Sequence, residues 1–170
     1  AANGDVLLCH HGIRRIVRIG RDMTVTTLVD SFQGKKLNAP NDIVFRSDGT
    51  LYFTDPPYGL PLQDDDPAKE LPFNGVFKLQ NGKLDVIITD LTRPNGIAFS
   101  PDEKTLYVSN SDERQRIWMR YDVGADGNVA AKRVDVVSTA GNNWVIGSGL
   151  ADGDQIIVSG LQVARPRMKV

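Results

Sequence analysis

Short runs of apolar and β-branched residues alternate with polar turn signals along the chain. The first runs are residues 6–8, Arg15–Ile19 and Val25–Val29, and tight-turn signals such as Asn81-Gly82 separate the later ones. Short strands joined by tight turns are typical of all-β proteins. Only residues 65–70 have the composition for a single helical turn, because no longer segment shows a helical period. The pattern therefore predicts an all-β fold.

An internal repeat organises these runs. Residues 37–45 match residues 91–99, with Asn41 and Asn95 separated by 54 positions, and the match continues from 48–55 to 102–110 with one inserted residue. Further strand pairs accompany each match, so each unit reads as four strands over roughly 40–55 residues, which is the pattern of a β-propeller blade. We expect about three four-stranded antiparallel blades, too few to close the ring of about 4–8 blades that propellers use.

Two Pro-Asn steps occupy matching positions at the start of the first strand of a unit. Because the first strand of a propeller blade faces the central channel, Asn41 and Asn95 would enter one axial pocket. Amide oxygens can bind a hard cation, and amide nitrogens can donate hydrogen bonds to substrate oxygens. Pro-Asn-Asp and Pro-Asn-Gly are also common turn sequences, so a structural role stays open.

Composition narrows the function classes. The 170 residues are 41% hydrophobic and 24% charged, as in a folded domain, and the net charge of −1 gives no support for a nucleic-acid or anionic-membrane partner. No apolar run approaches the roughly 18 residues of a membrane span. The one cysteine excludes an internal disulfide. The chain begins without Met, as a mature form or a fragment would.

A proline-rich stretch with three consecutive aspartates interrupts the second unit at residues 56–73. The composition predicts either a solvated surface loop or a rim segment over a central site. The aspartates lack the spacing and the glycine of an EF-hand, so they do not favour a calcium site.

The repeated segments resemble a known family. Residues 37–59 (LNAPNDIVFRSDGTLYFTDPPYG), residues 91–110 (LTRPNGIAFSPDEKTLYVSN) and residues 10–19 (HHGIRRIVRI) resemble the gluconolactonase/senescence marker protein/luciferin-regenerating family, over about residues 3–130. The resemblance implies a six-bladed propeller with a divalent cation, often calcium, at the channel mouth, and metal-dependent hydrolysis of sugar lactones. Mg²⁺, Zn²⁺ and Mn²⁺ are the alternative cations.

The same resemblance implies roles for four residues. Asn95 stands where the family has a metal-ligating Asn, and Asn41 stands where it has an Asn that contacts substrate or a metal-bound water. His11 and Asp55 lie in family-like segments and are candidate substrate-binding residues, although structural roles stay open for both. The implied cation polarises the lactone carbonyl and activates water, and a carboxylate acts as general base.

Two ligands that the family uses have no clear counterpart in this chain. A Glu usually precedes a Gly-Pro in the first blade, and the chain starts beyond that point. A Pro-Asp-Gly is expected near position 149, where the sequence offers only Asp152. We therefore expect an impaired or incomplete lactonase with no identified catalytic acid or base. The alternative is a non-catalytic propeller fragment or chimera that acts as a binding or assembly module.

The last residues depart from the repeat. Residues 149–170 resemble the membrane-proximal segment of efflux-pump periplasmic adaptors (membrane fusion proteins). We expect a partial propeller over residues 1–134 and a divergent β tail over residues 135–170. Strands near Trp144 and at residues 156–158 would add to the sheet of the last blade.

An open fan of blades leaves two unpaired sheet edges. We therefore expect a homodimer that approximates six blades, or pairing with a further segment. The sequence leaves open whether the compartment is the cytoplasm or the periplasm.

Overall fold

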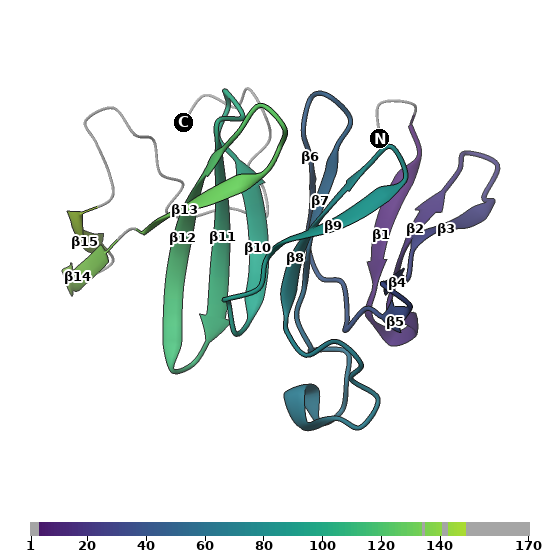
Figure 1. Cartoon of the computed structure of the whole chain (residues 1–170), viewed down its shortest axis with the longest axis horizontal. Coiled ribbons are helices and arrows are strands. Elements are labelled where there is room, and N and C mark those ends of the chain that lie inside the picture. The colour runs from purple at the N-terminus through teal and green to yellow at the C-terminus, as the bar shows by residue number, and fades with distance from the viewer. Residues whose placement is uncertain (1–3, 134, 141–142, 149–170) are drawn as a thin grey trace.

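A computed structural model describes residues 4–133, 135–140 and 143–148 of the chain (Figure 1). Within these residues the regular structure is almost entirely antiparallel β-strand, together with the short 3₁₀ turns η1 (His11–Ile13) and η2 (Gln63–Asp65). The strands are β1 (Val6–His10), β2 (Arg15–Ile19), β3 (Val25–Val29), β4 (Ser31–Phe32), β5 (Lys35–Lys36), β6 (Ile43–Phe45), β7 (Leu51–Asp55), β8 (Gly75–Gln80), β9 (Lys83–Ile88), β10 (Pro94–Phe99), β11 (Thr105–Asp112), β12 (Gln115–Val123), β13 (Val129–Arg133), β14 (Asp135–Ala140) and β15 (Asn143–Ser148).

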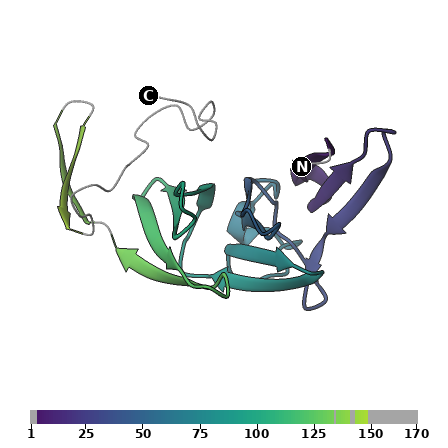
Figure 2. The ribbon, with the colours of Figure 1, turned by 90° about the horizontal axis from the view of Figure 1, so that it is seen from above.

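The strands form successive sheets in chain order. The first has the order β1-β2-β3, the second β6-β7-β8-β9 and the third β10-β11-β12-β13. Figure 2 shows these three sheets side by side along an arc, with β9 and β13 on its outer side. Each is a propeller-type blade, and the expected all-β blade architecture is confirmed. The described residues contain no helix with the length and apolarity of a membrane span.

Local sequence explains how the strands are joined. Asn81 and Gly82 both have positive φ, and they connect β8 to β9 as a two-residue hairpin turn with Gln80 opposite Lys83. Such turns match the right-handed twist of the strands, and Asn-Gly tolerates the left-handed backbone that they need. The sequence signal at Asn81-Gly82 therefore correctly predicts a tight turn between these two strands.

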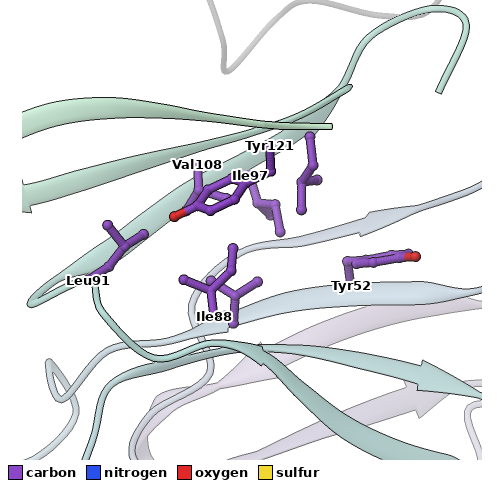
Figure 3. Close-up of a cluster of buried hydrophobic side chains, with 8 residues drawn as sticks. Tyr52, Ile88, Leu91, Ile97, Val108 and Tyr121 are labelled. Atoms are coloured by element: carbon purple, nitrogen blue, oxygen red, sulfur yellow. The ribbon is translucent and has the colours of Figure 1, made fainter. Parts of the chain in front are cut away.

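Strand β7 is buried along its whole length, because blades cover both of its faces. Leu51 and Phe53 pack toward the first blade, whereas Tyr52 packs toward the third. Two apolar clusters result. The cluster between the second and third blades is drawn in Figure 3 and contains Tyr52, Val76, Ile88, Leu91, Ile97, Leu106, Val108 and Tyr121. The period of two along β7 thus divides one strand between two cores.

Polar contacts also fasten the second blade to the third. The Tyr52 hydroxyl donates to the Gly127 carbonyl at 2.8 Å, and the Lys78 ammonium donates to the Asp126 carbonyl at 3.1 Å. At the turn between β6 and β7, the Glu103 carboxylate accepts hydrogen bonds from both the amide and the hydroxyl of Ser47.

Three expectations need correction. The first sheet has three strands among the described residues rather than four. The short helical turn lies at Gln63–Asp65 rather than at residues 65–70. The strand that contains Trp144 pairs with β14 in a two-stranded sheet, and among the described residues neither strand pairs with the third blade. The expected strand at residues 156–158 and the candidate Asp152 lie outside the described residues.

Candidate active site

The two Pro-Asn segments lie next to each other at the same end of the second and third blades. Thr54, near the end of β7, joins them. Its hydroxyl accepts a hydrogen bond from the Asp42 amide at 3.2 Å and donates one to the Asn95 carbonyl at 2.7 Å. The backbone N–H of Asn41 in turn donates to the Thr54 carbonyl at 2.9 Å. The structure therefore brings Asn41 and Asn95 to adjoining backbone segments.

Asp42 provides a second link between these segments. One carboxylate oxygen accepts a hydrogen bond from its neighbour Ile43 at 2.9 Å, and the other accepts one from the Ile97 amide in the next blade at 3.0 Å. A carboxylate that accepts two backbone N–H groups is held in a fixed orientation. Asp42 thus sets the spacing between the second and third blades where the two asparagines lie.

The half-buried Asn95 amide has one partner of its own. Its Nδ2 donates to the Ser111 hydroxyl at 3.2 Å, and that hydroxyl also hydrogen-bonds the Tyr58 hydroxyl. Among the described residues, neither the Asn95 Oδ1 nor the Asn41 side chain has a hydrogen-bond partner. These groups are available to a ligand.

Asp55 is fully buried, and both of its oxygens are occupied. Oδ2 accepts the Asn38 amide and Oδ1 accepts the Ala39 amide, each at 2.7 Å. Burial raises the pKa of Asp55 to about 7, although these two hydrogen bonds and the Arg14 charge act in the opposite direction. Asp55 therefore holds the loop that leads to Asn41.

His11 begins the turn between β1 and β2, at the end of the first blade that approaches Ala39 and Gly59. A Cβ at position 59 would lie 2.9 Å from the His11 carbonyl oxygen and 2.8 Å from the Ala39 Cβ. Glycine at 59 therefore permits the 56–74 loop to lie directly against the first blade. The structure brings His11 to the same end of the fold as the Pro-Asn segments.

The 56–74 loop is fastened on both sides. Arg14 donates to the Ala68 carbonyl at 2.8 Å, and the Glu70 carboxylate accepts the Lys36 amide at 2.8 Å. Asp64 pairs with Arg93, which lies just before Pro94. Leu71 is buried in the cluster between the first two blades. The loop forms a rim beside the site.

The donor chemistry does not by itself complete a site for a divalent cation. Calcium takes about six to eight oxygen ligands, usually with carboxylates among them. Asn41 and Asn95 offer amide oxygens, but both oxygens of Asp42, the carboxylate that links their segments, already accept backbone N–H groups. No group of three His, Cys, Asp or Glu residues among those described could hold a metal ion.

Sequence reasoning missed three connecting residues. Thr54 had a detectable signal, because Ser109 stands at its repeat position and its hydroxyl likewise accepts a hydrogen bond from the residue after Asn95, the Gly96 amide, at 2.8 Å. A hydroxyl repeated at this position indicates that each blade fastens its own Pro-Asn turn. Tyr58 and Ser111 had no such signal, because their contact joins the rim loop to the third blade across 53 positions.

Comparison with known proteins identifies the family of the chain. The family model for the SMP-30/gluconolactonase/LRE-like region matches residues 1–160. The gluconolactonase of Zymomonas mobilis is 45% identical over 130 residues, which cover 74% of this chain and 36% of that protein. The solved structure of a gluconolactonase from Xanthomonas campestris superposes with a TM-score of 0.66 at 38% identity, covering 74% of this chain and 42% of that one. The chain thus spans less than half the length of these relatives.

The resemblance to efflux adaptors is weak and partial. The periplasmic linker BepF of Brucella suis is 50% identical over 48 residues, which cover 28% of this chain and 12% of that protein. The family match to residue 160 crosses the expected boundary at residue 134, so that boundary stays a prediction. With the propeller-type blades and a family match over most of its length, the chain belongs to the SMP-30/gluconolactonase/LRE-like family.

Proposed function

We propose that the chain contributes to the hydrolysis of a sugar lactone. The observation that supports this most directly is the convergence of Asn41 and Asn95 at one end of two adjacent blades, in a chain 45% identical over 130 residues to a gluconolactonase. Sugar lactones carry a ring ester and several hydroxyl groups. Fixed amides bind such groups as donors and acceptors, and a fixed donor also stabilises the oxyanion that develops when water attacks the ester.

The candidate residues take different parts in this proposal. Asn41 and Asn95 contact the substrate or its bound water, because their side chains retain free hydrogen-bonding capacity. Asp55 acts indirectly, since its buried carboxylate holds the loop that carries Asn41. His11 lines the same end of the first blade. We further propose that Asn95 supplies one oxygen to a divalent cation, calcium foremost, with the remaining ligands lying outside the described residues.

Hydrolysis of glucono-δ-lactone, followed by acid release at constant pH, tests the proposal. The expected result is turnover above the spontaneous rate, reduced about a hundredfold by Asn95→Ala, as for loss of a fixed polar group in an active site. Gln80→Ala is the matched control, because it removes a side-chain amide at the end of β8 that lies away from Asp55 and the candidate site. Equal rates for Asn95→Ala and the control would contradict a role for Asn95.

A non-catalytic binding role is the second candidate, and it is favoured because no group of three His, Cys, Asp or Glu residues among those described is arranged to hold a metal ion. In that case the chain binds the lactone, or its hydrolysis product gluconate, without turnover. Calorimetric titration with gluconate, compared with the turnover assay above, separates the two functions, because binding of gluconate without lactone turnover supports the non-catalytic role. Titration with calcium chloride alone tests the cation proposal, and heat that disappears in Asn95→Ala is the expected result.

A further inference from the structure

The side-chain amide of Asn95 is asymmetric in its contacts. Nδ2 donates to Ser111, whereas Oδ1 accepts no hydrogen bond from a described residue. An asparagine amide can rotate by half a turn and exchange its oxygen and nitrogen at nearly constant shape. A site that needs Oδ1 toward the ligand therefore requires something that prevents this exchange.

The hydroxyl contacts of Ser111 supply that constraint. Ser111 has one hydroxyl proton, and three groups surround its oxygen: the Asn95 amide, the Tyr58 hydroxyl and, at 3.5 Å, the Arg93 carbonyl. If Ser111 donates its proton to Tyr58 or to the Arg93 carbonyl, it can only accept from Asn95, so Nδ2 must face it. The exchanged amide is compatible only when Ser111 withholds its proton from both of these partners.

The backbone around Ser111 keeps this hydroxyl in place. The Ser111 amide donates to the Arg93 carbonyl at 2.9 Å, and the Arg93 amide donates to the Asn110 side chain at 2.5 Å. Arg93 and Asn95 flank Pro94, whose ring restricts the backbone between them. On the other side, Tyr58 belongs to the rim loop, which Asp64 ties to Arg93.

We propose that Ser111 and Tyr58 are positioning residues that fix the orientation of the Asn95 amide and so present its Oδ1 to the ligand. The proposal rests on the proposed function for the identity of the ligand, because Oδ1 serves there either as the acceptor for a lactone hydroxyl or as the oxygen that binds the cation. The amide orientation itself is a property of the free chain and can be measured without substrate.

Nitrogen-15 spectra of the side-chain amides test the orientation directly. The Asn95 pair is assigned as the signal that Asn95→Asp removes. In Ser111→Ala we expect this pair to shift and its protons to exchange with water about three- to tenfold faster, because one hydrogen bond of ordinary strength is lost. Ser111→Thr keeps the hydroxyl and restores the original signal, and Tyr58→Phe gives an intermediate change.

Ser47→Ala is the matched control, because it removes a hydroxyl that binds Glu103 instead. Unchanged Asn95 amide signals in Ser111→Ala, or the same change in Ser111→Thr, would overturn the proposal. Where lactone turnover is measurable, Ser111→Ala raises KM and Ser111→Thr restores it. A wild-type chain without turnover counts against the proposed function alone, since the amide measurement is unaffected.

Discussion

Asp55 and Asn110 stand at the same position of successive repeats, and each fastens the loop that leads into the innermost strand of its blade. Asp55 accepts two backbone amides. Asn110 accepts one, from Arg93, and its Nδ2 donates to the Thr92 hydroxyl at 3.0 Å and to the Gln115 carbonyl at 2.9 Å. A carboxylate only accepts, whereas an amide also donates, so each residue type matches the partners of its own blade.

Because Asp55 can ionise and Asn110 cannot, the free energy of unfolding should depend on pH through Asp55. Asp55 has a pKa of about 7 in the folded chain and about 3.9 when unfolded. Burial raises the folded value, although the Asn38 and Ala39 hydrogen bonds and the charges of Arg14 and Lys69 lower it in part. The folded state therefore holds a proton that the unfolded state releases between these values. Its contribution to stability is greatest below pH 4 and falls by up to about 4 kcal/mol as the pH rises to 7.

Urea unfolding of Asp55→Asn at several pH values checks this prediction. The variant is less stable by about 1–3 kcal/mol at low pH, because its Nδ2 cannot accept the second backbone amide. The decline between pH 4 and 7 is absent from it. Asp65→Asn removes an exposed carboxylate and controls for the loss of a charge. A decline as steep in Asp55→Asn as in the wild type would refute the assignment.

Cys9 also lies in an unfavourable environment for its ionised form. Burial, together with the negative charges of Asp42 and Asp55, raises its pKa to about 12. Because the thiolate is the nucleophile, native Cys9 should react with iodoacetamide at pH 8 about a thousandfold more slowly than in denaturant. Comparable rates in the two conditions would show that the thiol ionises normally.

At the scale of the element, most strands could be predicted from the sequence, but their grouping into sheets could be predicted only in part. Runs such as Leu51–Asp55 carry both apolar character and bounding turn signals, and the repeat assigns them to blades. Strand β15 has an equally clear run, yet its partner is β14 instead of the third blade. Sheet membership depends on tertiary contacts that periodicity does not encode. The Ser111–Tyr58 contact escaped prediction for the same reason.

The interface between the second and third blades depends on complete side chains. Leu106 is fully buried in that cluster, so Leu106→Ala should lower the free energy of unfolding by about 2–5 kcal/mol through lost burial and a cavity. Leu62→Ala is the control, because it makes the same change at a side chain that is 62% exposed in the rim loop. Chemical denaturation measures both, and similar losses would indicate that the blades do not pack as described.

At the scale of the whole molecule, the face of the first blade that points away from the second blade is largely apolar and, among the described residues, uncovered at Val6 and Leu8. Val6, Ile19 and Val25 are cross-strand neighbours on one face, and Leu8 lies on the same face of β1. Val6 is 59% exposed and Leu8 is 44% exposed. The opposite face packs Leu7 and Ile16 against the second blade. The uncovered face thus has the composition of a blade interface.

We therefore propose that two copies associate through such faces and approximate a six-bladed ring. Light scattering at increasing concentration should approach twice the 18.7 kDa of one chain. Val6→Asp places a charge on the proposed interface and shifts the mass to that of one chain, whereas Asp22→Asn, on the turn after β2, leaves it unchanged. A constant single-chain mass in the wild type would exclude the dimer.

The order of strands within each blade has a consequence for how the chain reaches this structure. Neighbouring strands in a blade are also neighbours along the chain, so every sheet closes by short hairpins, except where the rim loop intervenes. The contacts between blades span far longer separations, such as the 75 positions between Tyr52 and Gly127. Short loops close faster than long ones. Each blade can therefore form as it leaves the ribosome and then dock on the blade before it, so folding proceeds in the direction of synthesis.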